Sequence, residues 1–185
     1  MRSEGDETTS DAGENILSWA RAILETTPVR WTQLTQTAPE ELLARVPVPG
    51  EWSAVECLRH LLDVERNVFP PRVRAILAGQ DFPAFDPAGR EGEAGLTAQQ
   101  LAAAFAQARE VGLAALSQVS EDDLDRTGRH SQLGVMSLRE LLHAWAAHDL
   151  NHTVQAERAA MQPFIAGSGA LAFRFADHVA KGSGS

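Results

Sequence analysis

The segment "LLHAWAAHDLNHTVQAER", residues 141–158, contains three of the six histidines of the chain. On a helix, His148 and His152 lie one turn apart on the same face, with Cβ atoms roughly 5–6 Å apart. His143 points away from that face. Two imidazoles at this spacing can bind one cation at about 2.0–2.1 Å. The alternative is a pair of half-exposed histidines without a ligand, because a single His-x3-His motif is weak evidence.

A third histidine would strengthen the interpretation of this pair as a metal site. His60 stands within "ECLRHLLDVE", residues 56–65, among leucines at helical spacing. It is either a core histidine whose hydrogen bonds are satisfied within the protein or a third metal ligand. The second alternative arises because helical bundles build metal sites from inward residues on facing helices. Three neutral histidines leave coordination positions of an ion open, which is the layout of a catalytic or exchangeable site.

Two residues beside His60 could also reach an ion. Cys57 lies one turn before His60 and could be a fourth ligand, but a small buried hydrophobe is the favoured interpretation. Glu56 could point inward, but a role in helix capping already accounts for it. No other catalytic side chain is assigned, so acid–base work would depend on metal-bound water or on carboxylates.

Further candidates surround the predicted site. Trp52 and Trp145 either line a pocket or pack in the core, and core packing is favoured for each. Asp63 or Asn151 could orient a ligand imidazole through a hydrogen bond. His130 precedes the last long helix, where a surface position is favoured over one at the mouth of the site.

The elements that must position these residues are helices. Hydrophobic residues recur at helical spacing from Ile16, with an interruption expected at Pro28. No alternating pattern indicates a strand. Ser53, Thr97 and Ser137 are predicted N-caps, the first and last with capping-box glutamates three residues later. Helices are predicted over 38–47, 54–79 with a break at the two prolines 70–71, 98–119, 138–160 and 169–180, with a loop over 80–95. The sequence therefore predicts an all-α protein, a four-helix bundle.

Composition limits the function. The chain has 185 residues, a net charge of −9, one lysine and one cysteine, which excludes a disulfide framework and gives no general attraction for nucleic acid. We find no signal peptide or membrane span, so we expect a soluble, cytoplasmic protein. We predict a disordered acidic tail over 1–12, a single domain over 13–180 and a flexible end over 181–185.

Two segments resemble the signatures of the DinB-like metal-binding bundle family. They are "GEWSAVECLRHLLDVE", residues 50–65, and "GVMSLRELLHAWAAHDLNHTVQ", residues 134–155, and the resemblance covers roughly residues 14–160. It implies an up-down-down-up four-helix bundle with metal ligands His60, His148 and His152. The chain departs from the pattern at Asn151, where many members have a histidine.

The resemblance also implies an activity. Characterised members include mycothiol-dependent maleylpyruvate isomerase and other transferases that use low-molecular-weight thiols. We therefore expect a divalent metal ion (zinc, nickel or iron), a low-molecular-weight thiol as a second cofactor, and a small electrophilic substrate attacked in a transferase or hydrolase reaction. The alternatives are a non-catalytic metal- or small-molecule-binding stress-response protein and an interaction module without a metal. We expect a homodimer.

Overall fold

A computed structural model of the protein describes residues 11–84 and 95–181. Most of the predicted tail over 1–12 lies outside the described residues, as do the middle of the predicted 80–95 loop and residues 182–185. None of the described helices combines the length and the apolar character needed to cross a membrane.

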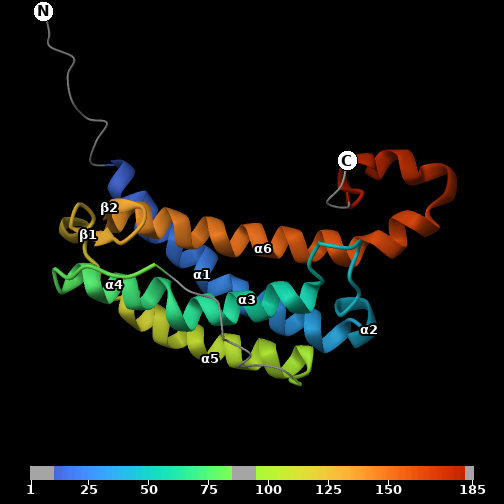
Figure 1. Ribbon diagram of the computed structural model, residues 1–185, viewed down its shortest axis with the longest axis horizontal. Coiled ribbons are helices and arrows are strands. Elements are labelled where there is room, and N and C mark those ends of the chain that lie inside the picture. The colour runs from blue at the N-terminus through green and yellow to red at the C-terminus, as the bar shows by residue number, and fades with distance from the viewer. Residues whose placement is uncertain (1–10, 85–94, 182–185) are drawn as a thin grey trace, which may run out of the picture.

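Four long helices form the bundle shown in Figure 1. They are α1 (Asp11–Thr37), α3 (Ala54–Asn67), which α4 (Phe69–Leu77) extends, α5 (Ala98–Leu116) and α6 (Leu138–Gly167). Helices α1 and α6 run in one direction, and α3 and α5 run in the other. Each of α1 and α3 packs against both α5 and α6. The predicted all-α bundle with up-down-down-up topology is confirmed.

The predicted helix starts are also confirmed. Ser53, Thr97 and Ser137 are N-caps, and each forms a capping box with the residue three positions later. Helix α3 ends just before Pro70, as the two prolines predicted. The leucines that follow the caps of α3 and α6 are buried in the core: Leu58, Leu61, Leu62, Leu138 and Leu142. The caps therefore set where the two helices that carry the histidines begin.

Pro28 does not interrupt the first helix, so the predicted break is wrong. Helix α1 continues through it to Thr37. A proline has no N–H, which leaves the carbonyl four residues earlier without its helical donor. That carbonyl belongs to Leu24, and it accepts a 2.7 Å hydrogen bond from the Arg109 guanidinium on α5. A side chain from a neighbouring helix thus replaces the missing backbone donor. Helix α6 likewise continues past the predicted end at residue 160, through Pro163, to Gly167.

Within the described ranges, five short elements connect or follow the long helices. Helix α2 (Glu40–Leu43) and the 3-10 turn η1 (Glu121–Asp123) lie in connections, and the 3-10 segment η2 (Gly169–His178) follows α6. Strands β1 (Thr127–His130) and β2 (Gly134–Ser137) form an antiparallel hairpin. The prediction of no strand is therefore wrong. Each strand has only four residues, mostly polar or glycine, which is too short for an alternating hydrophobic pattern.

Gly112 on α5 occupies a position with no room for a side chain. A Cβ there would clash with Glu65 Oε1 and would lie 3.1 Å from Trp145 and 3.2 Å from Pro70. We expect Gly112→Ala to destabilise the protein by about 1–3 kcal/mol, as other overpacked cores do, although alanine has the higher helix propensity. Urea unfolding measures the change. Gly167→Ala at the end of α6, where a Cβ meets nothing within 4 Å, is the control, and equal stabilities of the two variants would contradict the prediction.

Candidate metal centre

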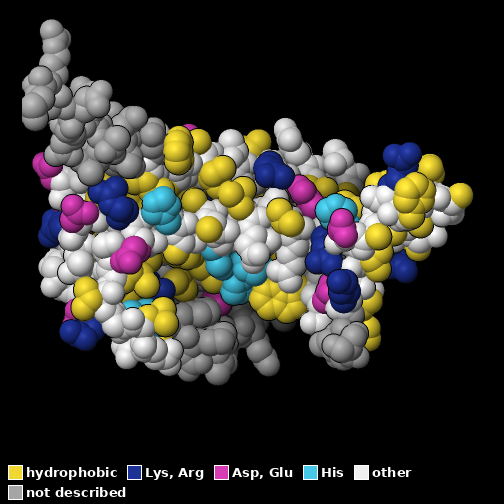
Figure 2. Space-filling model, turned by 90° about the horizontal axis from the view of Figure 1, so that it is seen from above, with side chains coloured by type: hydrophobic (Ala, Val, Ile, Leu, Met, Phe, Trp, Pro, Cys, Tyr) yellow, Lys and Arg dark blue, Asp and Glu magenta, His cyan; other side chains and the backbone are white. Residues whose placement is uncertain are grey.

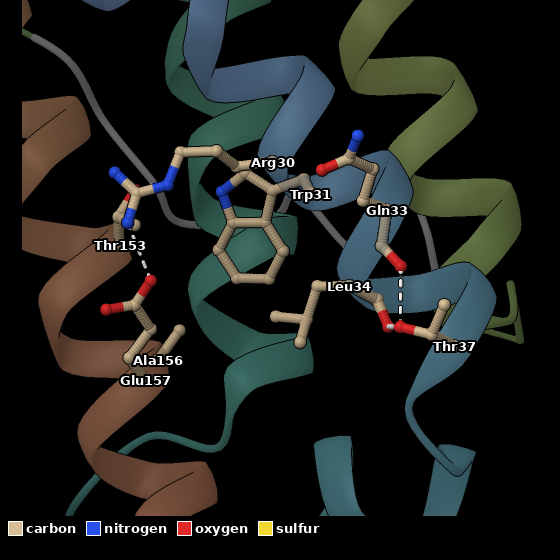
Figure 3. A pocket seen from close by; sticks show the side chains of 8 residues that line it. All are labelled: Arg30, Trp31, Gln33, Leu34, Thr37, Thr153, Ala156 and Glu157. Atoms are coloured by element: carbon tan, nitrogen blue, oxygen red, sulfur yellow. Dashed lines mark hydrogen bonds and ion pairs between the residues drawn. The ribbon is translucent and has the colours of Figure 1, made fainter.

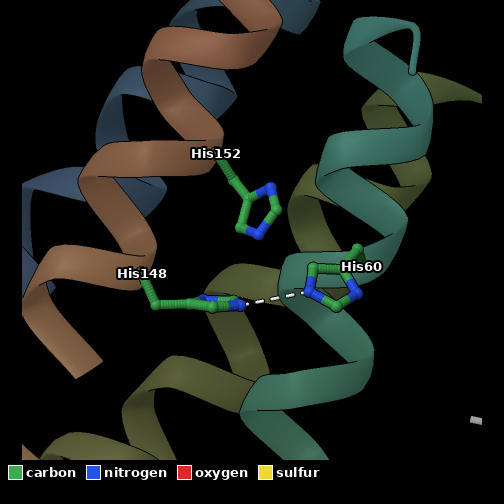
Figure 4. Close-up of side chains that lie close together, drawn as sticks. All are labelled: His60, His148 and His152. Carbon is green, nitrogen blue, oxygen red and sulfur yellow. Dashed lines mark hydrogen bonds between the residues drawn. The ribbon is translucent and has the colours of Figure 1, made fainter. Parts of the chain in front are cut away.

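The structure brings together the three histidines that the sequence singled out (Figure 4). His60 comes from α3, and His148 and His152 come from successive turns of α6. The Nε2 atoms of His60 and His148 are 3.1 Å apart. One ligand atom from each of the three rings lies within 4.8 Å of the others. Nitrogens that share a tetrahedral ion at 2.0–2.1 Å stand about 3.3 Å apart, so the donor set fits one divalent cation after small side-chain adjustments.

Gln155 orients one of the three rings. Its Oε1 atom lies 3.0 Å from His152 Nδ1. When Nδ1 carries the proton and donates to this oxygen, Nε2 keeps its lone pair for a ligand, as in many metal sites. The sequence analysis gave Gln155 no role. Of the two residues expected to orient an imidazole, Asn151 is exposed, and Asp63 accepts a hydrogen bond from Asn67.

The surroundings keep all three imidazoles neutral at pH 7. Burial, together with the charges of the two other histidines and of Arg109, lowers the pKa of His148 to about 3. Burial also lowers the pKa of His60, against the opposing effect of Asp63. For His152, burial lowers the pKa more than Gln155 and Asp149 raise it. Because a metal binds the unprotonated nitrogen, the three rings are in the form that can bind a cation.

Trp52 forms one wall of the cluster. Its ring stacks on His152 at 5.6 Å between centroids and 20° between planes, and it lies 5.0 Å from the His60 ring. Trp52 remains 38% exposed, so the expectation of core packing is wrong for this residue. Trp145 does pack in the core, fully buried and stacked on Phe69. His60 and His148 are partly exposed, so molecules in solution can approach the site.

Neither the remaining candidates nor the other histidines of the chain belong to the cluster. Cys57 is fully buried, and burial raises the pKa of its thiol to about 12, so it behaves as the small hydrophobe expected. Glu56 serves the cap of α3. His143 and His178 are exposed. His130 was expected at the surface, but it is buried on β1 against the Phe82 ring, 3.2 Å from the Arg72 guanidinium.

A buried ionic network adjoins the histidines, and the sequence analysis missed it. Arg109 on α5 donates to both carboxylate oxygens of Asp149, at 2.8 and 3.1 Å, and to Glu65 Oε2 at 2.8 Å. The Trp145 indole donates to the same Glu65 oxygen. The three charged side chains are at most 2% exposed. Asp149 directly follows His148, so the network holds α6 in register at the candidate site. The partners lie 40 or more residues apart in the chain, so no local sequence pattern revealed them.

Comparisons with known proteins agree with this architecture. The family model of the DinB superfamily matches residues 23–156. No curated protein matches the sequence. Among solved structures, the chain is similar to YfiT from Bacillus subtilis, described as a probable metal-dependent hydrolase with an unusual four-helix bundle topology. The match has a TM-score of 0.68 at 14% identity and covers 88% of this chain and 94% of YfiT. The family match spans well over half of the chain and includes His60, His148 and His152. The protein therefore belongs to the DinB superfamily.

Proposed function

We propose that the protein is a metal-dependent enzyme that holds one divalent ion, zinc, nickel or iron, on His60, His148 and His152. The observation that carries the proposal is the convergence of three ligand atoms within 4.8 Å of one another, on rings that burial keeps unprotonated. The description of YfiT as a probable metal-dependent hydrolase supports it. Three neutral ligands leave the charge of the ion uncompensated and part of its coordination sphere open.

The proposed reaction is the attack of a thiol or of water on a small electrophilic molecule, in a transferase or a hydrolase reaction respectively. A divalent ion would supply Lewis acidity, which lowers the pKa of a bound thiol or water. Residues of the chain would orient a ligand ring and contact the substrate. Gln155 holds the His152 ring in one tautomer and orientation, and Trp52, half-exposed beside two of the histidines, offers a flat apolar wall for a substrate.

The test combines a thiol panel with chelation. Purified protein is incubated with one reactive chloro-arene or epoxide and with mycothiol, bacillithiol, glutathione or no thiol, with and without a chelator. Turnover that needs one thiol and disappears on chelation supports the transferase. Chelator-sensitive turnover without thiol supports the hydrolase. Near one ion per chain with no turnover favours the alternative, a metal- or small-molecule-binding stress-response protein. Protein that binds no ion after incubation with zinc, nickel or ferrous iron refutes the proposal.

The lowered histidine pKa values predict weak pH dependence of metal binding. Three histidines with ordinary pKa values near 6.5 would lose roughly fifty-fold in affinity between pH 7.5 and 6.0, because protons compete for the ligand nitrogens. Here burial lowers all three pKa values, so acid competes only at lower pH. We expect a loss clearly smaller than fifty-fold over the same interval. Competition titration with a chromogenic chelator measures it, and a fifty-fold loss would contradict the prediction.

We also propose that the protein is a homodimer. The end of α6 and the segment η2 expose large apolar side chains, at the right-hand end of the molecule in Figure 2: Phe164, Leu171, Phe173 and Phe175. Large exposed apolar patches are typical of protein interfaces. We expect light scattering at micromolar concentration to give twice the 20.0 kDa chain mass, and Phe173→Ser to shift the protein toward monomer. A monomeric wild type removes this proposal.

A further inference from the structure

A second cavity lies between α1 and α6, away from the three histidines. It has a volume of about 530 Å³, within the range of roughly 300–1,000 Å³ typical of small-molecule sites. Trp31 and Leu34 line it from α1, and Thr153 and Ala156 line it from α6 (Figure 3). His148 and His152 instead meet His60 of α3. The two sites thus lie between different pairs of helices.

The indole N–H of Trp31 is the unusual feature of this cavity. Trp31 is 2% exposed, and its Nε1 atom has no hydrogen-bond partner among the residues that the structure describes. Buried donors are almost always paired, because leaving one unpaired costs the desolvation of the group. Figure 3 shows the indole ring amid the lining side chains, with its nitrogen toward α6. A ligand oxygen would satisfy this donor.

The rim of the cavity carries two charges that cancel. Arg30 of α1 and Glu157 of α6 form a 2.7 Å ion pair that bridges the two helices. Both charges are therefore already compensated, and a charged ligand would have to break this pair. The remaining surface combines the Trp31 ring, Leu34 and Ala156 with the uncharged polar side chains Gln33, Thr37 and Thr153. The cavity is thus suited to an uncharged, mainly apolar molecule.

We propose that this cavity binds a neutral apolar small molecule through one carbonyl-type oxygen, which accepts a hydrogen bond from the Trp31 indole. The apolar part of the ligand packs on Leu34 and Ala156, and the Arg30–Glu157 pair spans the rim. The Thr37 and Thr153 hydroxyls already donate to backbone carbonyls, and the unpartnered indole is the donor that we assign to the ligand. This site needs no metal and is independent of the activity proposed above.

The four tryptophans lie in different environments, so one NMR spectrum of their indole N–H groups can test the proposal. Trp31 lies at the cavity, Trp52 beside the histidines, Trp145 in the core, and Trp19 is exposed on α1. The indole N–H signals of ¹⁵N-labelled protein in chelator are followed while acetophenone is added, and single Trp→Phe variants assign them. We expect a saturable downfield shift of the Trp31 proton and little change at the other three. Cumene, which has the same shape but no oxygen, should cause a much smaller shift.

A variant measures the contribution of the indole donor. Trp31→Phe should weaken acetophenone binding about 2- to 12-fold, the usual range for one hydrogen bond, and leave cumene binding nearly unchanged. Ligand-observed saturation-transfer titrations give both affinities, and Trp19→Phe is the matched control. If Trp31→Phe does not fold, the comparison of the two ligands on the wild type decides. The proposal is overturned if neither ligand moves the Trp31 signal, if both move it equally, or if acetophenone moves Trp52 instead.

Discussion

Replacing Arg109 by methionine is expected to lower the free energy of unfolding by about 3–5 kcal/mol, which corresponds to a fall in melting temperature of roughly 6–20 °C for a chain of this size. The substitution leaves the carboxylates of Glu65 and Asp149 buried without their shared cation. It also removes the donor that bonds to the Leu24 carbonyl, which Pro28 deprives of its helical partner. Burial already raises the pKa of Glu65, so loss of Arg109 should lead this carboxyl to take up a proton.

A matched surface variant isolates the effect of burial. Arg30→Met breaks the 2.7 Å pair with Glu157, whose two side chains are 49% and 52% exposed. Exposed pairs contribute about 0–1 kcal/mol, so this variant should melt within a few degrees of the wild type. Thermal denaturation followed by circular dichroism compares the two. If Arg109→Met and Arg30→Met lower the melting temperature equally, the buried network does not have the stabilising role assigned to it.

The second large effect concerns the ion proposed on the three histidines. An ion that binds only the folded state stabilises it by RT ln(1 + [M]/Kd), which is about 2.7 kcal/mol at one hundred times Kd and about 4.1 kcal/mol at one thousand times Kd. Chelation should therefore lower the melting temperature of the wild type by roughly 5 °C or more. His152→Ala removes one of three ligands, so it should melt near the chelated wild type and respond little to the chelator.

His143→Ala is the control on the same helix. His143 is exposed and lies outside the cluster, so this variant should keep the metal content and the chelator response of the wild type. The buried leucines of α3 and α6 should keep all of the variants folded. Metal analysis of the purified proteins provides a second measurement. The metal assignment fails if the melting temperatures of wild type and His152→Ala are equal both with and without chelator.

Local features of the fold could be predicted from the sequence because their causes are local. A serine or threonine cap bonds to the backbone three residues later, so Ser53, Thr97 and Ser137 marked helix starts without reference to the rest of the chain. The four-residue spacing likewise placed His148 and His152 on one face of their helix. The periodic leucines identified the buried faces.

Two predictions about the backbone, a break at Pro28 and the absence of strands, were wrong because of interactions that the local sequence pattern does not show. The α1 helix passes through Pro28 while a guanidinium from α5, 85 residues away in sequence, bonds to the carbonyl that the proline leaves free. The hairpin before α6 depends on cross-strand pairing between short polar segments. Helix propensity and hydrophobic periodicity describe one turn of helix or one strand at a time, so neither arrangement can be recognised from them.

The candidate site also combines features that the sequence predicted with features that only the tertiary structure shows. The sequence by itself determined which histidines are one turn apart and which face each shares with apolar residues. Only the tertiary structure decided that His60 meets that pair, because the packing of α3 against α6 sets the 3.1 Å separation of the His60 and His148 Nε2 atoms. It also placed Trp52 on His152 and paired Asp149 with Arg109. These contacts join residues far apart in the chain, and their geometry depends on how whole helices pack.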